Sequence, residues 1–303
     1  MKIIKRIFLG IVALLLSILL IWTLLMFWSF PRYLAEKEPI SLDTIYEEGE
    51  VRIMNYNVRC LSPLDLGKKS WFYRANLIID SIEKEAPTIL GFQEVTKWQY
   101  DYLCDTLSDF DSIITYRDDS LASEGCPIFY QTTLYTLIDK GSFWLSETPD
   151  VMSKDWGAAH YRICSYVILS DIATDTEFVV FNTHLDHVSD EARINGIGVV
   201  LEKIAEFGGI PAILMGDLNA EESSSTYTNA TKHFCDVKYQ TKNTMTSCTY
   251  QNWGTELDRN CIDYVMVSPE NFIVNSYKVV TNTYEGVYTS DHFPLSVNLT
   301  FEK

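Results

Sequence analysis

The chain has 303 residues, of which 47% are hydrophobic and 21% charged, and its 41 acidic and 24 basic side chains give a formal net charge of −17. Proteins that grip a nucleic-acid backbone usually present a basic stripe, so this balance argues against high-affinity binding of duplex DNA. It leaves nucleotides, short oligonucleotides and phosphorylated headgroups open as ligands, because a bound cation can supply positive charge locally.

The first element in chain order is an apolar segment at residues 7–30 that contains no charged side chain. A membrane-spanning helix needs roughly 20 apolar residues, whereas the apolar part of a cleaved signal peptide has about 7–15. We therefore predict an uncleaved anchor over residues 1–30, with a cleaved signal peptide as the alternative. Lys2, Lys5 and Arg6 precede the segment, and such charges usually stay in the cytoplasm. The pattern predicts a single-pass membrane protein with a cytoplasmic amino terminus and an extracytoplasmic main domain.

Residues 31–50 contain prolines and acidic residues without a helical apolar stripe, which predicts a linker. Residues 51–303 are predicted to form one large domain, since β-rich domains often reach about 200–250 residues without splitting. The seven cysteines include no C-x-x-C pair of the kind that binds zinc. Their odd number leaves at least one thiol unpaired, and Cys248 and Cys261, which flank a predicted hairpin, are the one candidate disulfide.

Short strands alternate with a few helices in the main domain. Residues 74–84, 98–107 and 191–207 carry apolar side chains at helical spacing. Runs that alternate or are continuously apolar, bounded by turn residues, predict strands at residues 51–58, 88–95, 126–131, 133–138, 162–170, 177–185, 211–219, 248–253, 261–268 and 292–301. Repeated strands with few helices favour two packed sheets with helices outside them.

Several of these strands end in, or contain, acids, amides or histidines. The polar residues are Asn57, Glu94, His184 with Asp186 and His187, Asp217 with Asn219, Asp263, and Asp291 with His292. Carboxylate and amide oxygens are ligands that suit a hard cation such as Mg²⁺ or Mn²⁺. A histidine beside a carboxylate is a tunable base. Any one such residue is more often a solvated or capping group, but the six clusters together predict a cation site that acts on phosphate.

The sequence around these clusters resembles the endonuclease/exonuclease/phosphatase family. The resemblance covers about residues 51–300, and it rests on the motifs MNYNVR, GFQEV, NTHLDH, GDLNA, IDYVMVS and SDHFPL in the order of the family. It implies an α/β fold, a four-layer sandwich of two mostly antiparallel sheets flanked by helices. It also implies a Mg²⁺- or Mn²⁺-dependent phosphoester hydrolase, a phosphodiesterase, nuclease or phosphatase, in which a metal-activated water attacks phosphorus.

The motifs also imply which residues bind the metal. By its place in GFQEV, Glu94 is similar to the principal metal carboxylate of the family, with Asn57 beside it. Asp291 of the SDH motif is expected to contribute to a metal or its waters. For Asn57 alone, a buried structural amide is the competing interpretation.

The catalytic residues follow from the resemblance in the same way. Asp217 and Asn219 resemble the pair that positions the attacking water and the scissile phosphate. His292 resembles the general base or phosphate-contacting histidine, oriented by Asp263, which could instead cap a strand. His184 matches the position that stabilises the transition state.

A finer resemblance is to a subgroup with the segments EGCPIFYQ, FWLSETPD at residues 143–150, and RICSY. Glu124 and Arg162 lie in these segments and are candidate substrate residues, because an arginine can bind phosphate through two hydrogen bonds. An arginine at the start of a strand is more often a rim charge. Asp186 is a further substrate candidate, with support of its loop as the alternative.

Two other functions stay open from the sequence. The anchor gives a reason for an enzyme to act at a bilayer, which would suit a sphingomyelinase-like phospholipase C. A non-catalytic binding module would show erosion of the clustered residues, and none of the six clusters is eroded. The predicted partners are therefore a phosphoester substrate and, through the amino-terminal helix, a membrane.

Overall fold

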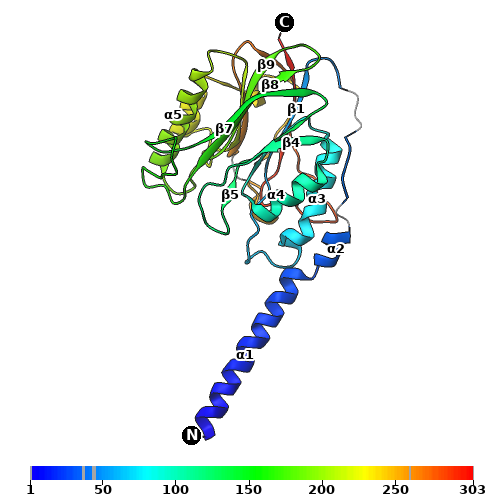
Figure 1. Cartoon of the computed structure of the whole chain (residues 1–303), viewed down its shortest axis with the longest axis vertical. Helices are drawn as coiled ribbons and strands as arrows, with labels where there is room; N and C mark the ends of the chain where they lie inside the picture. Colours follow the sequence, from blue (N-terminus) through cyan, green and yellow to red (C-terminus); the bar gives the residue numbers. More distant parts are fainter. Residues whose placement is uncertain (1, 36–37, 43–45, 259–260, 303) are drawn as a thin grey trace.

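The computed structural model describes residues 2–35, 38–42, 46–258 and 261–302, and it confirms the predicted sandwich. Two β-sheets lie face to face, and helices cover their outer faces (Figure 1). The seven-stranded sheet has the order β12 (Thr244–Met245), β14 (Phe272–Val279), β15 (Leu295–Phe301), β1 (Glu50–Asn57), β2 (Ile89–Gln93), β6 (Ile128–Gln131) and β4 (Phe110–Ile113). The six-stranded sheet has the order β11 (Cys235–Asp236), β13 (Asp263–Val267), β10 (Ala212–Asp217), β9 (Glu177–His184), β8 (Ile163–Asp171) and β7 (Tyr135–Trp144). A small antiparallel pair joins β3 (Val95–Thr96) to β5 (Glu124–Gly125).

Side chains along each strand point alternately into the core between the two sheets and into the layer between a sheet and its helices. In β1, Val51 and Ile53 enter the core between the sheets, whereas Met54 and Tyr56 point to the outer layer. Helices α3 (Trp71–Glu85) and α4 (Lys97–Thr106) complete that outer layer. Helices α5 (Asp190–Glu206) and α6 (Ser225–Ala230) cover the opposite sheet. The core between the sheets is continuous, so the two sheets hold their strand ends in fixed relation.

Two parallel pairings bring the predicted polar ends together. β1 pairs in parallel with β2, and β9 pairs in parallel with β10. Helix α3 connects the first pair and α5 the second, as parallel neighbours require a crossover. Asp217 lies opposite His184 on one side and opposite Asp263 on the other. The carboxyl ends of β1, β2, β9 and β10 therefore present their polar residues at one edge of the sandwich.

Some predicted elements were wrong, and some strands were missed. Residues 248–253 form no strand, because Asn252 and Trp253 adopt positive φ angles of 46° and 57° and the chain turns into a 3₁₀ helix, Asn252–Gly254. The long strand β14 was not predicted, since a register shift between Val274 and Ser276 interrupts its alternation. The candidate disulfide is also wrong: Cys248 and Cys261 are separate buried thiols.

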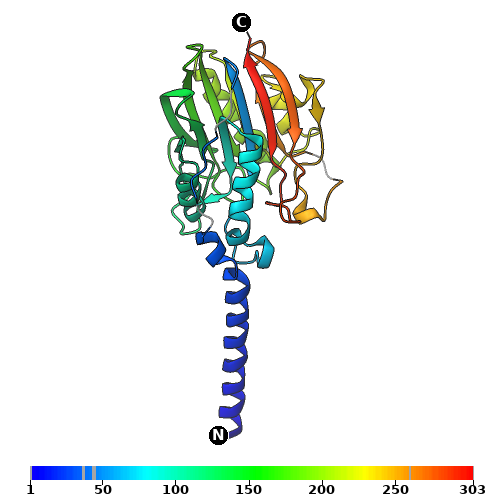
Figure 2. The same cartoon turned by 90° about the vertical axis from the view of Figure 1, so that its right-hand side faces the viewer.

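The amino-terminal helix α1 (Lys2–Phe27) projects from one end of the sandwich, opposite the carboxyl terminus (Figure 2). The helical stretch Ile3–Ala35 has a mean hydropathy of 2.8 in its most apolar window and is long enough to cross a membrane. The segment predicted as a linker begins with helix α2 (Phe30–Ala35), not with irregular chain. Tyr33 of α2 is buried and stacks on Tyr102 of α4, so this segment packs onto the domain.

Candidate active site

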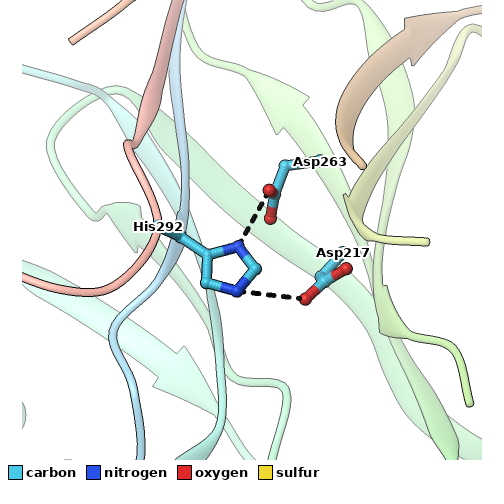
Figure 3. A group of neighbouring side chains, drawn as sticks. All are labelled: Asp217, Asp263 and His292. Carbon is cyan, nitrogen blue, oxygen red and sulfur yellow. Dashed lines mark hydrogen bonds and ion pairs between the residues drawn. The ribbon is translucent and has the colours of Figure 1, made fainter. Parts of the chain in front are cut away.

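The carboxylates of Asp217 and Asp263 lie beside the two ring nitrogens of His292 (Figure 3). The Nδ1 atom of His292 lies 2.9 Å from Asp263 Oδ2, and its Nε2 atom lies 3.8 Å from Asp217 Oδ2. All three side chains are at least nine-tenths buried. Burial alone would lower the pKa of His292, but the carboxylates of Asp263, Asp217 and Asp291 raise it to about 10. The imidazole is therefore held in one orientation and carries positive charge between the carboxylates.

Asn57 links the two sheets at this edge. Its Nδ2 atom donates to Glu94 Oε1 at 3.1 Å and to Asp217 Oδ2 at 3.0 Å. The backbone N–H of Cys60 donates to the other Glu94 oxygen at 3.0 Å. Glu94 stands between β2 and β3 with a φ of 63°, a left-handed conformation that is uncommon outside glycine. The structure therefore holds the Glu94 carboxylate beside that of Asp217 at the cost of backbone strain.

His184 and Asn219 form the neighbouring wall. Asn219 Nδ2 lies 3.0 Å from His184 Nε2 and donates to the carbonyl oxygen of Leu185 at 3.1 Å. Burial, and then the positive charge of Arg162, hold the pKa of His184 well below its usual value. The contact of 3.5 Å between His184 Nε2 and Asp217 is consequently not an ion pair, because the imidazole is neutral.

A cleft of about 540 Å³ opens beside these groups. Eight of the predicted site residues line it: Glu94, Glu124, Arg162, His184, Asp217, Asn219, Asp291 and His292. The other three, Asn57, Asp186 and Asp263, lie behind the lining and contact residues that reach it. The predicted set thus converges on one cavity.

Two arginines and two histidines, Arg117, Arg162, His160 and His187, also line the cleft and form one wall of contacting residues. Arg117 binds Glu124 through two hydrogen bonds, at 2.7 and 3.0 Å. Burial, and then the negative charge of Glu94, raise the pKa of Glu124 to about 7. Arg162 contacts His187 Nδ1 at 3.1 Å, and the ring of His187 stacks on His160. This wall has the charge and the donors to bind an anionic group.

Asp186 supports this wall and does not itself line the cleft. Its carboxylate accepts backbone hydrogen bonds from Ala159 at 2.9 Å, Val188 at 3.0 Å and Ser189 at 2.9 Å, with a longer one from His160 at 3.4 Å. The side chain is buried, and Arg162 approaches it at 3.7 Å. The geometry therefore favours the loop-supporting alternative over direct contact with substrate.

Further residues of the cleft were not predicted from the sequence, among them Arg59, Arg117, His160 and Tyr250. Arg59 closes the MNYNVR motif and was available as a signal. Its guanidinium lies between Asp65, at 3.0 Å, and Asp291, at 3.8 Å. Arg117 stands in a polar loop and carries no comparable signal, since only the fold brings that loop to the cleft.

The donor set fits a hard divalent cation. Glu94, Asp217, Asp263 and Asp291 place four carboxylates in one largely buried region. Burial, and then the nearby Asp263, raise the pKa of Asp217 to about 7, which reflects negative charge that is incompletely compensated. The ligand atoms of Asp217, Asp263 and His292 lie within 4.8 Å of one another. Asp263 and His292 already bond to each other, whereas the carboxylates of Glu94 and Asp291 line the cleft and could reach a cation there. Asn57 lies behind them, and its Oδ1 atom accepts from the backbone N–H of Arg59 at 3.0 Å.

Comparison with known proteins gives extended matches. A model of the Endonuclease/Exonuclease/phosphatase family matches residues 54–292. A crystal structure of a protein of that family from Bacteroides thetaiotaomicron is 33% identical, with a TM-score of 0.79, over 85% of this chain and 100% of that chain. A mannosyl-6-phosphatase from the same organism is also 33% identical, with a TM-score of 0.77, over 83% of this chain and 100% of that chain.

Matches to curated proteins are more distant and partial. The Ccr4 exoribonuclease subunit of the CCR4-Not complex from Emericella nidulans is 22% identical over 58% of this chain. The aligned part is 32% of that protein, and it is 33% and 60% of two uncharacterized proteins of Acanthamoeba polyphaga mimivirus. The chain therefore spans only about one to two thirds of the length of these curated relatives.

Proposed function

Since the chain belongs to the endonuclease/exonuclease/phosphatase family, whose members are phosphoesterases, we propose that it is a divalent-cation-dependent phosphoester hydrolase acting in the cleft described above. The observation that supports this most is the placement of His292 between Asp263 and Asp217, with Glu94 joined to the same group through Asn57. These groups come from both sheets and from strands far apart in the sequence. Their meeting at one cavity suits concerted acid–base and electrostatic catalysis.

In this proposal Glu94 and Asp291 would hold Mg²⁺ or Mn²⁺, and Asn57, expected from its motif to be a ligand, would position the Glu94 carboxylate through its hydrogen bond of 3.1 Å. When bound there, such a cation would supply positive charge beside the phosphate oxygens and help to activate water. Magnesium usually retains several waters and takes only one or two protein carboxylates, so a small ligand set is sufficient. Arg59, which is paired with Asp291 and Asp65, provides a fixed positive charge at the same end of the cleft.

The remaining roles follow from the contacts of each side chain. Asp263 fixes the Nδ1 side of His292, which leaves Nε2 facing Asp217 and able to exchange a proton with the reacting oxygen. Asp217 and Asn219 position the attacking water and the phosphate. His184 and the amide of Asn219, which contact each other at 3.0 Å, are placed to stabilise the negative charge that develops on the phosphoryl oxygens.

A phosphate monoester on a sugar or other small headgroup is the substrate class that we favour. The mannosyl-6-phosphatase is a relative at 33% identity that this chain covers completely, which supports this choice. Arg117, Arg162, His160 and His187 form the anion-binding wall, and the cleft of about 540 Å³ suits a small polar ligand. The net charge of −17 argues against duplex DNA.

The anchor and the domain limits are part of the same proposal. Residues 1–30 form a membrane anchor, and residues 51–303 form the catalytic domain outside the cytoplasm. The hydropathy of α1 and the positive charges before it support this arrangement. The FWLSETPD segment and the 33% identity to two Bacteroides proteins support placement in the corresponding bacterial subgroup.

A substrate panel tests the proposed function. The full-length chain in detergent with Mg²⁺ is offered mannose 6-phosphate, inositol phosphates, nucleotides, a short oligonucleotide and duplex DNA, and phosphate or nucleotide release is measured. We expect turnover of at least one small monoester and none of duplex DNA. Preferred cleavage of duplex DNA would contradict the substrate class, and failure on every ester would contradict the function.

A further inference from the structure

The catalytic end of the sandwich is the end that carries the anchor. Figures 1 and 2 show α1 leaving one end of the domain and the carboxyl terminus at the opposite end. Glu50 pairs with Thr300 close to that terminus, and Asn55 pairs with Leu295 at the other end of the ladder. β1 therefore runs toward α1, and Asn57 lies at the anchor end. Because β2 is parallel to β1, Glu94 follows at the same end.

Hydrogen bonds join α1 directly to the loop that follows β1. The indole N–H of Trp22 donates to the carbonyl oxygen of Pro63 at 2.9 Å. One turn further along α1, the carbonyl oxygen of Met26 accepts from the hydroxyl of Ser70 at 3.0 Å. The last turns of the anchor helix are thus held against residues 61–70 at both ends of that loop.

A polar and aromatic cluster fixes the same junction from the other side. Trp28 stacks on Tyr73 of α3 with ring centroids 5.3 Å apart. Arg32 binds the carboxylate of Glu285 at 2.6 and 2.7 Å, and the Tyr73 hydroxyl donates to that carboxylate at 3.0 Å. With contacts on both sides, the helix cannot swing freely, so the orientation of the domain relative to its anchor is set.

The tip of the loop lies level with the outer part of the apolar helix. Residues 7–26 alone extend about 30 Å as an α-helix, which equals the hydrocarbon thickness of a typical bilayer. Trp22 falls inside that stretch, and Pro63, its partner, lies beside it. The next residue, Leu64, is 84% exposed. An exposed leucine at this depth would contact lipid at the membrane interface.

The same loop reaches the cleft within a few residues. Asp65, which follows Leu64, is bonded to Arg59 at 3.0 Å, and both Arg59 and Cys60 line the cleft. Lys68 and Lys69 stand in the loop next to Ser70, which bonds to the anchor helix. In a chain with a net charge of −17, this pair places positive charge where anionic headgroups would lie.

We propose that the docked anchor holds the loop of residues 61–70 in the membrane interface and the cleft at the bilayer surface. The phosphoester that is hydrolysed then belongs to the headgroup of a lipid in the same membrane. This inference rests on the proposed function and specifies where its substrate is carried. A flexible tether would let the domain reach soluble esters in any orientation. The fixed junction instead favours substrates presented at the surface, which meet the cleft in one orientation.

The test compares lipid-borne and soluble esters with the full-length chain in phosphatidylcholine vesicles containing Mg²⁺. Phosphate release is measured from vesicles that also carry phosphatidic acid or phosphatidylinositol phosphates, and separately from glycerol 3-phosphate and soluble inositol phosphates. We expect a vesicle-borne ester to be preferred. Leu64→Ser should lower its turnover about tenfold, from the loss of leucine burial, and leave soluble esters unaffected. Ile172→Ser is the matched control, because Ile172 is an exposed residue at the far end of the sandwich.

A second measurement does not depend on activity. In a Cys104→Ser background, which removes the exposed thiol, a fluorophore on Leu64→Cys should be quenched by brominated phosphatidylcholine, and one on Ile172→Cys should not. Equal quenching at both positions, or hydrolysis of soluble esters with no preference for vesicle-borne ones, would overturn the inference and leave the proposed function standing. Hydrolysis of no ester at all would overturn both.

Discussion

Replacing Glu94 by glutamine is expected to lower phosphoester hydrolysis about a thousandfold, because the change removes the charge that best fits a cation ligand. Glutamine has nearly the same size and can still accept one of the two hydrogen bonds, from Asn57 and from the Cys60 backbone, that hold the carboxylate. The fold should therefore persist. The rate of phosphate release and the concentration of Mg²⁺ that gives half-maximal rate are the measurements.

Glu177→Gln is the control for this variant. Glu177 is exposed at the start of β9, at the end of the strand away from the cleft. It should keep the rate and the Mg²⁺ requirement of the unmodified chain. If Glu94→Gln behaved like Glu177→Gln, Glu94 would have no part in cation binding or catalysis.

Replacing His292 by alanine should reduce the rate by about 10²- to 10⁴-fold, the usual contribution of a positioned acid or base. Asp263→Asn should reduce it as well, since the Oδ2 atom that orients His292 Nδ1 would lose its charge. Because Asp263 acts through His292, the double variant should be little slower than His292→Ala alone. Rates of the two single variants and the double variant on one substrate give the measurement.

His233→Ala serves as the matched histidine control, because His233 is exposed and lies outside the cleft. It should retain full activity. Additive losses from Asp263→Asn and His292→Ala would show that the two residues act independently, against the geometry in Figure 3. Full activity in His292→Ala would remove this histidine from the reaction.

The sequence predicted the polar residues of the site better than its walls. Asp217 ends β10, Glu94 follows β2 directly, and His292 precedes β15 by three residues, so a strand pattern and short motifs were enough to bring them together. Arg117 and His160 lie on irregular segments whose paths depend on tertiary packing. The path of an irregular segment leaves no periodic pattern in the sequence. These two residues could therefore be assigned to the site only from the fold.

Other differences have equally local causes. Strand β14 escaped prediction because a bulge breaks its alternation, and the supposed strand at residues 248–253 turns through two left-handed residues. Residues 31–50 were predicted to be a linker because they contain prolines and charged residues. That composition gives no indication that Tyr33 packs against Tyr102 of α4. That packing requires a surface on the main domain, which the local sequence cannot reveal.

In the proposed reaction, a divalent cation and the residues around His292 act jointly on a phosphoester. This joint action is tested most directly by measuring phosphate release from the best substrate of the panel before and after removal of cations with EDTA. We predict that chelation abolishes hydrolysis, and that added Mg²⁺ or Mn²⁺ restores it in the unmodified chain but only poorly in Glu94→Gln. Undiminished hydrolysis in EDTA would contradict the account.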